Sequence, residues 1–389
     1  MSKELLKMGS IAYQNFLESL KITRPIIQAP MAGVTSPKMV AEVCNNGALG
    51  SLPVSHINLK SSSGIAELRN LINEVKSYTR GTSLCRNVNL NFFCQEAILD
   101  ISSAQKENWC SLYEKVSNIA IDRKEFVFEE RSISFKEYED GKAFQDLLAF
   151  FKDEYKPKVV SFHFGHPTKR SIRALQDLGI QVYVTATCEE EYQLLLELQV
   201  DGVICQGYEA GGHRGNFLQL SERFDEKLST ACLVKRIMRL PKTEHKKVPF
   251  IIPAGGLNTP TDVKYMLEIG ASAVQIGTAF LGTTECKVSK KLHEILHEGK
   301  RPEPTLMIST VSGKSARAIS SPFLRNLHST YANEDLPDYG YMYNSFKKLR
   351  NLYPDKLNFM LAGQNYSSIE TNLSIAELLT YLSESVECK

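Results

Sequence analysis

Short runs of apolar residues alternate with longer segments of helical periodicity through most of the first 284 residues. Each apolar run has the length of a buried strand, and several are rich in the β-branched residues that favour strands. Strands are expected at residues 26–31, 48–53, 87–93, 159–165, 181–187, 202–206, 250–253 and 273–280. Helices are expected between them, at residues 37–45, 64–78, 169–178, 189–198, 227–239 and 261–269.

This alternation is typical of a parallel sheet whose strands are connected by helices, either a closed barrel or a doubly wound sheet. The eight expected strands, and the glycines that cluster after the last two, favour the closed form. We therefore predict an α/β protein built on a (β/α)8 TIM barrel, with an inserted or C-terminal helical domain.

Two stretches interrupt the alternation. About 65 residues, many of them charged or aromatic, separate the third and fourth expected strands, which is too many for one crossover helix. After residue 284 the pattern becomes mostly helical, with an interruption near Gly313 and Pro322. We predict four parts: the first part of the barrel (1–93), a helical insertion with its return helix (94–156), the second part of the barrel (157–284), and a mostly helical cap (285–389).

Composition and charge exclude several classes of protein. The net charge is +2, from 46 basic and 44 acidic side chains, which gives no electrostatic case for binding nucleic acid or an anionic membrane. The nine cysteines include no CxxC pair, so neither a disulfide framework nor a metal site is indicated. The apolar runs are shorter than the ~20 residues that span a bilayer, and no signal-peptide pattern begins the chain. A cytoplasmic protein is expected.

The most informative segment covers residues 202–215, where an apolar strand leads into a turn rich in glycine that contains His213. Glycines allow the backbone to approach a flat or phosphorylated ligand closely. Histidine is the side chain that exchanges protons near neutral pH. The segment therefore indicates a ligand site with a titratable group, with a solvated surface loop as the alternative.

Other candidate residues lie at the ends of the expected strands, because the loops there surround a common cavity in barrel enzymes. Ala29, Pro30 and Met31 end the first strand, where a fixed backbone can lie against a planar ring or simply bend. Asn91 ends the third strand and can present its amide to a heteroaromatic edge. His163 ends the fourth strand and is either a core histidine or a second member of the site.

Small residues follow the last two strands, where this fold commonly binds phosphate. The candidates are Ala254, Gly255 and Gly256 after the seventh strand, and Gln275, Gly277 and Thr278 around the end of the eighth. The chain has no Walker motif with its lysine, which excludes a P-loop. A bound mononucleotide cofactor is therefore favoured over a hydrolysed triphosphate.

In the C-terminal region Tyr339, Tyr343 and Lys347 recur every four residues, which places them on one face of a helix. Such a stripe forms either part of a site or a surface row of long side chains. Ala362, Gly363 and Gln364 follow closely, as a turn of small residues that can approach a ligand.

Together these segments resemble the nitronate monooxygenase family, once called 2-nitropropane dioxygenases, and within it the class I branch. The resemblance extends from residue 25 to about residue 364 and depends on the motifs at residues 28–33, 160–165, 206–215, 254–256 and 275–278. It implies a TIM barrel with a smaller helical substrate domain, and non-covalently bound FMN. Lys314 stands where the family usually has arginine, and Ser320 or Ser321 where asparagine is expected.

The resemblance also implies roles for individual residues. His213 matches the active-site histidine, and the substrate-binding positions are matched by His163, Tyr339, Tyr343 and Lys347. The residues that would line the flavin are Ala29, Pro30, Met31, Asn91, Gln206, Gly211, Ala254, Gly255, Gly256, Gln275, Gly277 and Thr278.

The implied activity is oxidative denitrification of alkyl nitronates, propionate 3-nitronate among them, by FMN and O2. In this family the reaction passes through a flavin semiquinone and gives a carbonyl compound with nitrite or nitrate. The implied partners are thus a small-molecule nitronate and O2, and the protein would be a monomer or a homodimer. If neutral nitroalkanes are also used, His213 would remove the α-proton.

Two alternatives remain open at this point. Flavin-dependent enoyl-ACP reductases of the same superfamily share the Ala-Gly-Gly-His loop and consume NAD(P)H with an enoyl thioester. They differ after the fourth strand, where this chain has Phe162, His163, Phe164 and Gly165. The other alternative is a flavin-binding barrel without catalytic activity, which would be yellow but turn over neither substrate.

Overall fold

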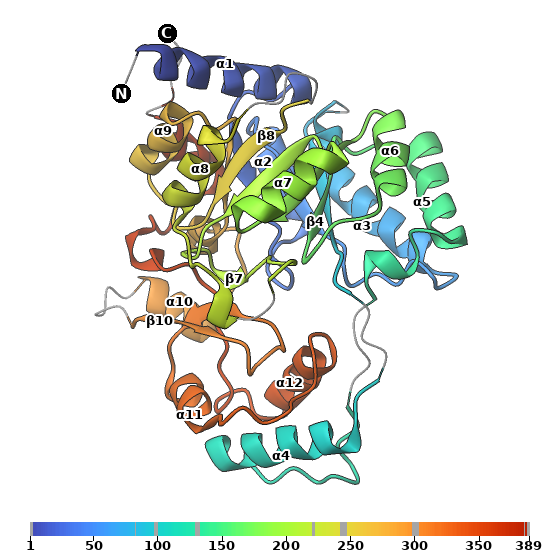
Figure 1. The fold of residues 1–389 in the computed structure, drawn as a ribbon, viewed down its shortest axis with the longest axis vertical. Helices are drawn as coiled ribbons and strands as arrows, with labels where there is room; N and C mark the ends of the chain where they lie inside the picture. Colours follow the sequence, from blue (N-terminus) through green and yellow to red (C-terminus); the bar gives the residue numbers. More distant parts are fainter. Residues whose placement is uncertain are drawn as a thin grey trace.

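The fold is described by a computed structural model, which covers residues 3–81, 83–96, 100–128, 133–219, 222–241, 247–297, 303–384 and 386. Within these ranges, eight parallel strands are hydrogen-bonded in the order β1-β9-β8-β6-β5-β4-β3-β2 (Figure 1). Ile27 forms a parallel bridge with Leu49 next to β2, which closes the sheet into a barrel. The strands are β1 (Ile26–Gln28), β2 (Gly50–Pro53), β3 (Val88–Phe93), β4 (Val159–His163), β5 (Gln181–Ala186), β6 (Gly202–Gln206), β8 (Phe250–Ala254) and β9 (Val274–Ile276).

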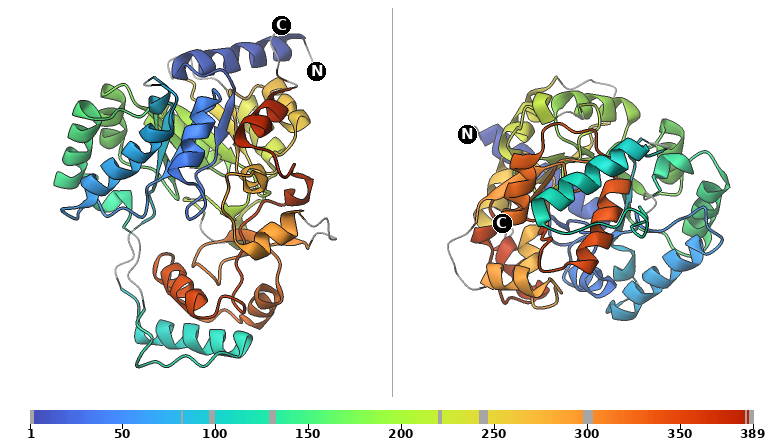
Figure 2. Two further views of the ribbon diagram at one scale, coloured as in Figure 1. Left: turned by 180° about the vertical axis from the view of Figure 1, so that it is seen from behind. Right: turned by 90° about the horizontal axis from the view of Figure 1, so that it is seen from below.

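Helices surround this barrel on its outer face (Figures 1 and 2). They are α2 (Pro37–Asn45), α3 (Gly64–Tyr78), α5 (Lys142–Asp153), α6 (Lys169–Asp177), α7 (Glu189–Leu198), α8 (Thr230–Arg239), α9 (Pro260–Glu268) and α13 (Ile375–Ser383). Serine or threonine begins several of them, because a side-chain oxygen there accepts a hydrogen bond from an otherwise unpaired backbone N–H. Ser36 accepts from Met39 at α2, and Thr259 forms a capping box with Asp262 at α9. These caps fix where each loop enters its helix.

The N-terminal end of the barrel is closed by α1 (Lys3–Leu20), which was not expected from the sequence. Phe16 and Leu20 of α1 are fully buried in one cluster with Ile27, Ile204 and other residues that point into the barrel. The Phe16 ring meets Phe250 edge-to-face, with the ring centroids 5.3 Å apart. A ligand must therefore be sought at the opposite, C-terminal end.

A second layer covers that opposite end (Figure 1). It contains a small antiparallel sheet in the order β10-β11-β7, made of β7 (Gly212–His213), β10 (Thr305–Ile308) and β11 (Ala316–Ile319). Helices α4 (Ser103–Ser117), α11 (Pro322–Thr330) and α12 (Tyr341–Leu352) lie beyond it, and α10 (Lys290–His297) lies beside it. Trp109 and Tyr113 of α4 stack at 4.2 Å within an apolar cluster that includes Phe323 of α11 and Phe346 of α12. This outer layer thus has a core of its own.

The structure confirms the predicted (β/α)8 barrel and corrects several details. The eighth strand ends at Ile276, because Gly277 leaves the extended conformation and a 3-10 helix begins at Thr278. Strands β10 and β11 lie in the region that we expected to be mostly helical. The long insertion contributes α4 to the outer layer, while α5 packs against α3 on the barrel.

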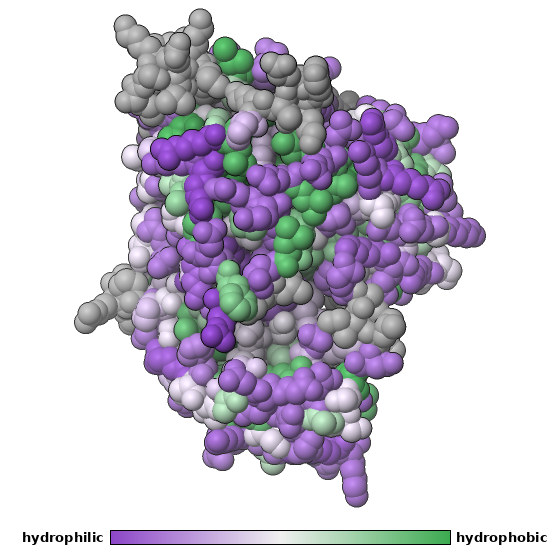
Figure 3. All heavy atoms as spheres, in the orientation of Figure 1, coloured by the Kyte–Doolittle hydropathy of each residue, from purple (hydrophilic) through white to green (hydrophobic). Residues whose placement is uncertain are grey.

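The face of the molecule in Figure 3 is mostly hydrophilic, with hydrophobic residues in small groups. The large hydrophobic side chains exposed within the described ranges are Ile11, Tyr78, Val127, Leu218, Phe224, Val248 and Leu352. They are scattered along the chain, and single exposed hydrophobic residues do not mark a docking surface. In the described part of the chain, no helix combines the length and apolar character needed to cross a bilayer.

Candidate active site

His213 is held by the small sheet over the C-terminal end of the barrel. It pairs with Ala316, and Gly212 pairs with Arg317, in an antiparallel ladder between β7 and β11. Gly212 has a φ of +76°, which a residue with a side chain rarely adopts. The glycine before the histidine therefore turns the chain from the barrel strand β6 into the small sheet.

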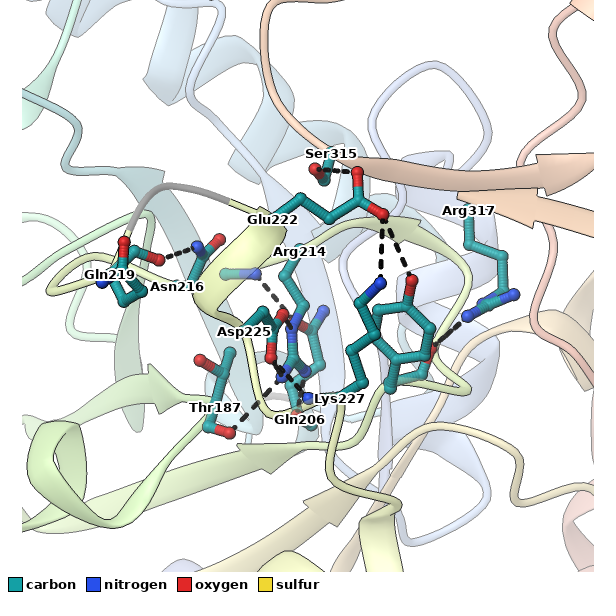
Figure 4. A network of polar contacts seen from close by, with 12 residues as sticks. Thr187, Gln206, Arg214, Asn216, Gln219, Glu222, Asp225, Lys227, Ser315 and Arg317 are labelled. Atoms are coloured by element: carbon teal, nitrogen blue, oxygen red, sulfur yellow. Dashed lines mark hydrogen bonds and ion pairs between the residues drawn. The ribbon is translucent and has the colours of Figure 1, made fainter. Parts of the chain in front are cut away.

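A buried polar network fixes the loop on either side of His213 (Figure 4). Arg214 forms an ion pair with Asp225 at 2.7 Å and donates to the carbonyl of Gln206 at 2.7 Å. Arg317 donates two hydrogen bonds to the carbonyl of Tyr208. Since breaking a buried ion pair leaves an uncompensated charge at a cost of about 3–5 kcal/mol, this network holds the loop firmly.

The side chain of Gln206 links the two ends of the same loop. Its Nε2 donates to the carbonyl of His213 at 3.0 Å, and its Oε1 accepts from the N–H of Gly215 at 2.8 Å. The resemblance placed Gln206 beside a flavin, and its amide is here engaged in bracing the histidine loop.

Aromatic rings surround the imidazole of His213. The rings of Tyr339 and Tyr343 each lie 5.3 Å from it, and the Phe164 ring lies at 5.7 Å, all edge-to-face. The Nζ atom of Lys347 stands 4.1 Å from the centre of the Tyr343 ring, a cation–π contact. The structure thus brings together candidate residues that are more than 120 positions apart in the sequence.

Tyr339 reaches this cluster in a way that the sequence pattern did not show. The spacing predicted one helix face for Tyr339, Tyr343 and Lys347, but α12 begins only at Tyr341. Gly340, with a φ of +101°, separates Tyr339 from the helix. The ring of Tyr339 nevertheless lies 6.3 Å from that of Tyr343 in a stacked arrangement.

His163 stabilises the loop that carries His213 through a hydrogen bond. Its Nε2 donates to the carbonyl of His213 at 3.2 Å, and its Nδ1 pairs with the Thr185 hydroxyl at 3.0 Å. Both ring nitrogens therefore have protein partners. A ligand can contact this side chain through its ring face.

Both histidines are neutral at physiological pH. Burial first, and then the charges of His163, Lys314 and Lys347, lower the pKa of His213 to about 3. Burial lowers the pKa of His163 to about 4, although its bond to the His213 carbonyl opposes the shift. Burial also lowers the pKa of Lys347. A neutral imidazole at the site can accept a proton.

These shifts predict that the protein loses stability as the pH falls below about 6.5. Between that pH and about pH 4 the unfolded chain binds protons that the folded His163 and His213 do not, so the free energy of unfolding decreases. Urea unfolding at pH 7.5 and pH 5 measures this. A His163→Asn/His213→Asn double variant should lose less stability over the same interval, and an equal loss in both proteins would contradict the assignment.

A rim of small residues lies next to this cluster. Gly255 and Gly256 have φ angles of +117° and +71°. The N–H group of Gly255 lies at the end of the ladder between β8 and β9, where Ala254 pairs with Gln275, whereas within the described residues the N–H group of Gly256 donates to no protein acceptor. A Cβ on Gly211 would lie 2.4 Å from the N atom of Gly363, so the histidine loop and the 362–364 turn touch. The free amide of Gly256 at this rim is suited to an anion such as phosphate.

The remaining candidate residues also lie at the C-terminal end of the barrel. A Cβ on Gly277 would meet Ala29 at 3.4 Å and Met31 at 3.7 Å, so the loops after β1 and β9 adjoin. Thr278 accepts a hydrogen bond from the N–H of Gly363. Pro30 follows Ala29 after β1, and Ala254, the last residue of β8, pairs with Gln275 of β9.

The buried side-chain amides of Asn91 and Gln275 differ in their hydrogen bonding. Asn91 donates to the Ser161 hydroxyl at 2.9 Å and thereby links β3 to β4. The Oε1 atom of Gln275 is buried, and it has no hydrogen-bond partner among the described residues. Because a buried polar atom without a partner is costly, a ligand that donates to Gln275 would relieve this cost.

Sequence reasoning missed three features of the site. Ser312 Oγ lies 2.9 Å from the Nε2 atom of His213, and Lys314 lies over the Phe164 ring at 4.9 Å. Lys314 was noted only as a departure from the family pattern, and Ser312 had no signal of its own. The pairing of Arg214 with Asp225 had no detectable signal, because it forms across an irregular loop.

The sequence of this chain is similar to those of known proteins. Residues 14–385 match the family described as nitronate monooxygenase. The chain is 34% identical to the nitronate monooxygenase of Pseudomonas aeruginosa, over 95% of this chain and 98% of that protein. It is 43% identical to a Saccharomyces cerevisiae protein that is itself named only provisionally as a nitronate monooxygenase, over 93% of this chain and 90% of that protein.

Solved structures agree with this result. A nitroalkane oxidase from Streptomyces ansochromogenes superposes with a TM-score of 0.74 at 25% identity, over 95% of this chain and 98% of that protein. FabK from Thermotoga maritima shares the fold with a TM-score of 0.64 at 21% identity, over 96% of each chain. The family match over nearly the whole length and the identity to these relatives show that this chain belongs to the nitronate monooxygenase family and is an enzyme.

Proposed function

We propose that this protein is an FMN-dependent nitronate monooxygenase that denitrifies alkyl nitronates with O2. The observation that carries the proposal is the convergence of His213, Tyr339, Tyr343 and Lys347 beside a rim of glycines that includes the unpaired amide of Gly256. A nitronate is an anion, and it requires positive charge or strong hydrogen-bond donors. The two tyrosine hydroxyls and the Lys347 ammonium are groups of this kind.

The chemistry of the rim suits FMN. The N–H group of Gly256 is suited to its phosphate, and the unpartnered Oε1 atom of Gln275 is suited to a hydrogen-bond donor on the polar edge of its ring. The closely packed loops that carry Ala29, Met31, Gly211 and Gly277 would flank the ring, together with Pro30, Asn91, Gln206, Ala254 and Thr278. When bound, the flavin supplies the electron transfer between the nitronate and O2. The chain's own residues bind and orient the substrate.

The outer layer is proposed as the substrate domain. Tyr343 and Lys347 come from α12, and the loop just before it supplies Tyr339, so this layer contributes most of the polar groups around His213. Tyr339 and Tyr343 are buried, and burial raises the pKa of both hydroxyls. They therefore stay protonated and can donate hydrogen bonds to an anionic substrate.

We further infer which nitrogen of His213 acts as a base. The Ser312 hydroxyl donates its one proton to the carbonyl of Lys314 at 2.9 Å, so toward His213 its oxygen can only accept. The Nε2 atom of His213 then carries the hydrogen, and Nδ1 has the free lone pair. With a neutral nitroalkane, the α C–H bond breaks, its proton goes to Nδ1, and the electron pair forms the C=N bond of the nitronate.

This inference predicts that Ser312 affects one class of substrate. Replacing Ser312 with alanine should lower kcat/KM for neutral nitroethane about fivefold, the factor that a neutral hydrogen bond of about 1 kcal/mol contributes. The kcat/KM for ethyl nitronate, which has already lost its proton, should change less than twofold. Ser312→Thr keeps a hydroxyl and should restore most of the nitroethane activity. Equal losses with both substrates in the alanine variant would show that Ser312 does not set the tautomer.

The proposed function is tested with the purified protein. We expect bound FMN, released on denaturation at one per chain, and O2 uptake with ethyl nitronate in the absence of pyridine nucleotide. An enoyl-thioester reductase would instead oxidise NADPH when crotonyl thioester is added. A protein that neither contains nor binds FMN, or that consumes no O2 with any nitronate, would overturn the proposal.

A further inference from the structure

A surface cavity of about 400 Å³ lies at the N-terminal end of the barrel, opposite to the end that carries His213. It forms where α6 and α7 end and where β5 and β6 begin, and its wall includes Arg173, Gly179, Gln181 and Asp201. Its volume is within the range of about 300–1,000 Å³ that sites for small molecules occupy. None of its residues belongs to the candidate active site.

Arg173 brings to this cavity a positive charge that no acidic side chain neutralises. Its Nη2 atom donates to the side-chain oxygen of Gln199 at 3.1 Å, and within the described residues its guanidinium forms no ion pair. A guanidinium has five N–H donors, so the others remain for a ligand. The side-chain oxygen of Gln181 accepts from the Tyr183 hydroxyl at 2.7 Å, and in the described part of the chain its amide nitrogen has no protein acceptor.

The negative groups near Arg173 have other partners. Asp201, the acidic residue of the cavity wall, is buried and pairs with Lys247. It also accepts from the side chain of Gln176 at 2.9 Å and from the N–H of Val182 at 2.8 Å. Carbonyl groups in the last turn of α6 accept from the N–H groups of residues 178–180. Neither the carboxylate nor the end of the helix therefore neutralises the guanidinium.

Two lysines adjoin the same wall. A Cβ on Gly179 would lie 3.8 Å from the Nζ atom of Lys156, so this ammonium stands at the edge of the cavity. The backbone carbonyl of Lys158 accepts from the N–H of Gln181 at 3.0 Å, which places Lys158 beside the wall as well. Within the described residues, neither lysine forms an ion pair.

The charges that act on Lys158 are all positive. Burial first, and then the charges of Lys21, Arg86 and Lys156, lower the pKa of Lys158. Lys158 is half-buried, whereas the three other side chains are exposed. Like charges that the fold holds together repel one another, and an anion bound among them would replace this repulsion with attraction.

We propose that this cavity binds a small phosphorylated molecule, whose phosphate oxygens are held by Arg173 and Lys156. A planar guanidinium can donate to two oxygens side by side, and an ammonium adds a compact charge, which together suit the several oxygens of a phosphate. The volume leaves room for more than one phosphate group. This inference does not depend on the proposed function, because the cavity and the candidate active site lie at opposite ends of the barrel.

Inorganic pyrophosphate is the probe, added to the purified protein in the presence of excess FMN, which keeps the proposed flavin site filled. Calorimetric titration should show binding that Arg173→Met and Lys156→Met each weaken about 10- to 100-fold, the factor that a hydrogen bond to a charged group contributes. Arg170 offers a matched control, because it is exposed on the same helix but does not line the cavity. Arg170→Met should leave the Kd unchanged. Equal affinities in all these proteins would overturn the inference.

The wild-type protein gives two measurements that need no variant. Citrate carries a comparable negative charge on carboxylates and should bind more weakly than pyrophosphate, and equal affinities would mean that charge alone is recognised. Pyrophosphate should also slow the acetylation of Lys156 by an amine-reactive reagent, followed by mass spectrometry, and leave that of Lys169, exposed on α6, unchanged. No protection of Lys156 would overturn the inference. A protein that binds no FMN would instead count against the proposed function, and the protection of Lys156 would still decide this inference.

Discussion

Replacing Gly255 with valine is expected to give a protein without bound flavin and with at least 100-fold weaker affinity for added FMN. The φ of Gly255 is +117°, and a Cβ there would lie 2.8 Å from the N atom of Ala210 and 2.9 Å from its Cβ. These neighbours are backbone and a short side chain, which cannot rotate away. The loop after β8 must move, with strain of about 1–3 kcal/mol in addition to the steric overlap, and the amides of the rim move with it. Fluorescence titration with FMN measures the change.

Two further variants show whether the effect belongs to the flavin site. A Cβ on Gly81 would meet nothing within 4 Å, so Gly81→Val should bind FMN as the wild type does. A Cβ on Gly277 makes only ordinary contacts with Ala29 and Met31, and its φ of −116° is open to any residue. Gly277→Ala should therefore fold normally yet bind FMN more weakly, because the new methyl group occupies the proposed flavin face. Full FMN binding by the Gly255→Val protein would contradict the proposed phosphate site.

The His213→Asn variant should lose at least 100-fold in kcat/KM for neutral nitroethane. Asparagine cannot accept the α-proton, and general base catalysis typically contributes 10²–10⁴-fold. With ethyl nitronate, which needs no proton removal, the loss should stay below about tenfold. Initial rates of O2 uptake with the two substrates give the comparison, and the ratio of the two losses identifies the base.

His328 offers a matched control, because it is an exposed histidine on α11 outside the site. His328→Asn should leave both activities unchanged. Equal losses with nitroethane and ethyl nitronate in the His213 variant would mean that His213 orients the substrate without removing a proton. A wild-type enzyme that consumes ethyl nitronate and leaves nitroethane unreacted would also show that His213 is not a base.

The barrel could be predicted from the sequence because its strands are short, apolar and separated by helices of clear periodicity. Where the prediction differs from the structure, the difference comes from local backbone geometry, from the shortness of a strand or from packing between distant segments. Gly277 ends β9 four residues before the apolar run ends at Phe280. Strands β10 and β11 are four residues long, and a run of that length does not distinguish a strand from a helix. Helix α1 occupies its position because Phe16 and Leu20 fill the end of the barrel. Such packing between distant segments leaves no local pattern in the sequence.

The residues of the candidate site also divide into those that a local pattern in the sequence indicated and those that only the folded structure brings together. His213, Gly255 and Gly277 could be proposed as candidates because glycines and histidines at strand ends have few structural reasons to be there. The contacts that orient His213 could not, since Ser312 reaches it across 99 positions of sequence and Arg214 meets Asp225 across an irregular loop. Tyr339 was proposed as a candidate through a helical spacing, although it lies outside the helix.

The ladder between β7 and β11 also bears on the order in which the molecule is assembled. Every barrel strand has been synthesised once Ile276 has left the ribosome, yet the residue that pairs with His213 lies 40 positions later, at Ala316. Contacts between distant segments form late, because they must close a long loop of chain first. A nascent chain can thus pair all eight barrel strands while the imidazole is still unanchored, and the surroundings of His213 are assembled after the sheet beneath them.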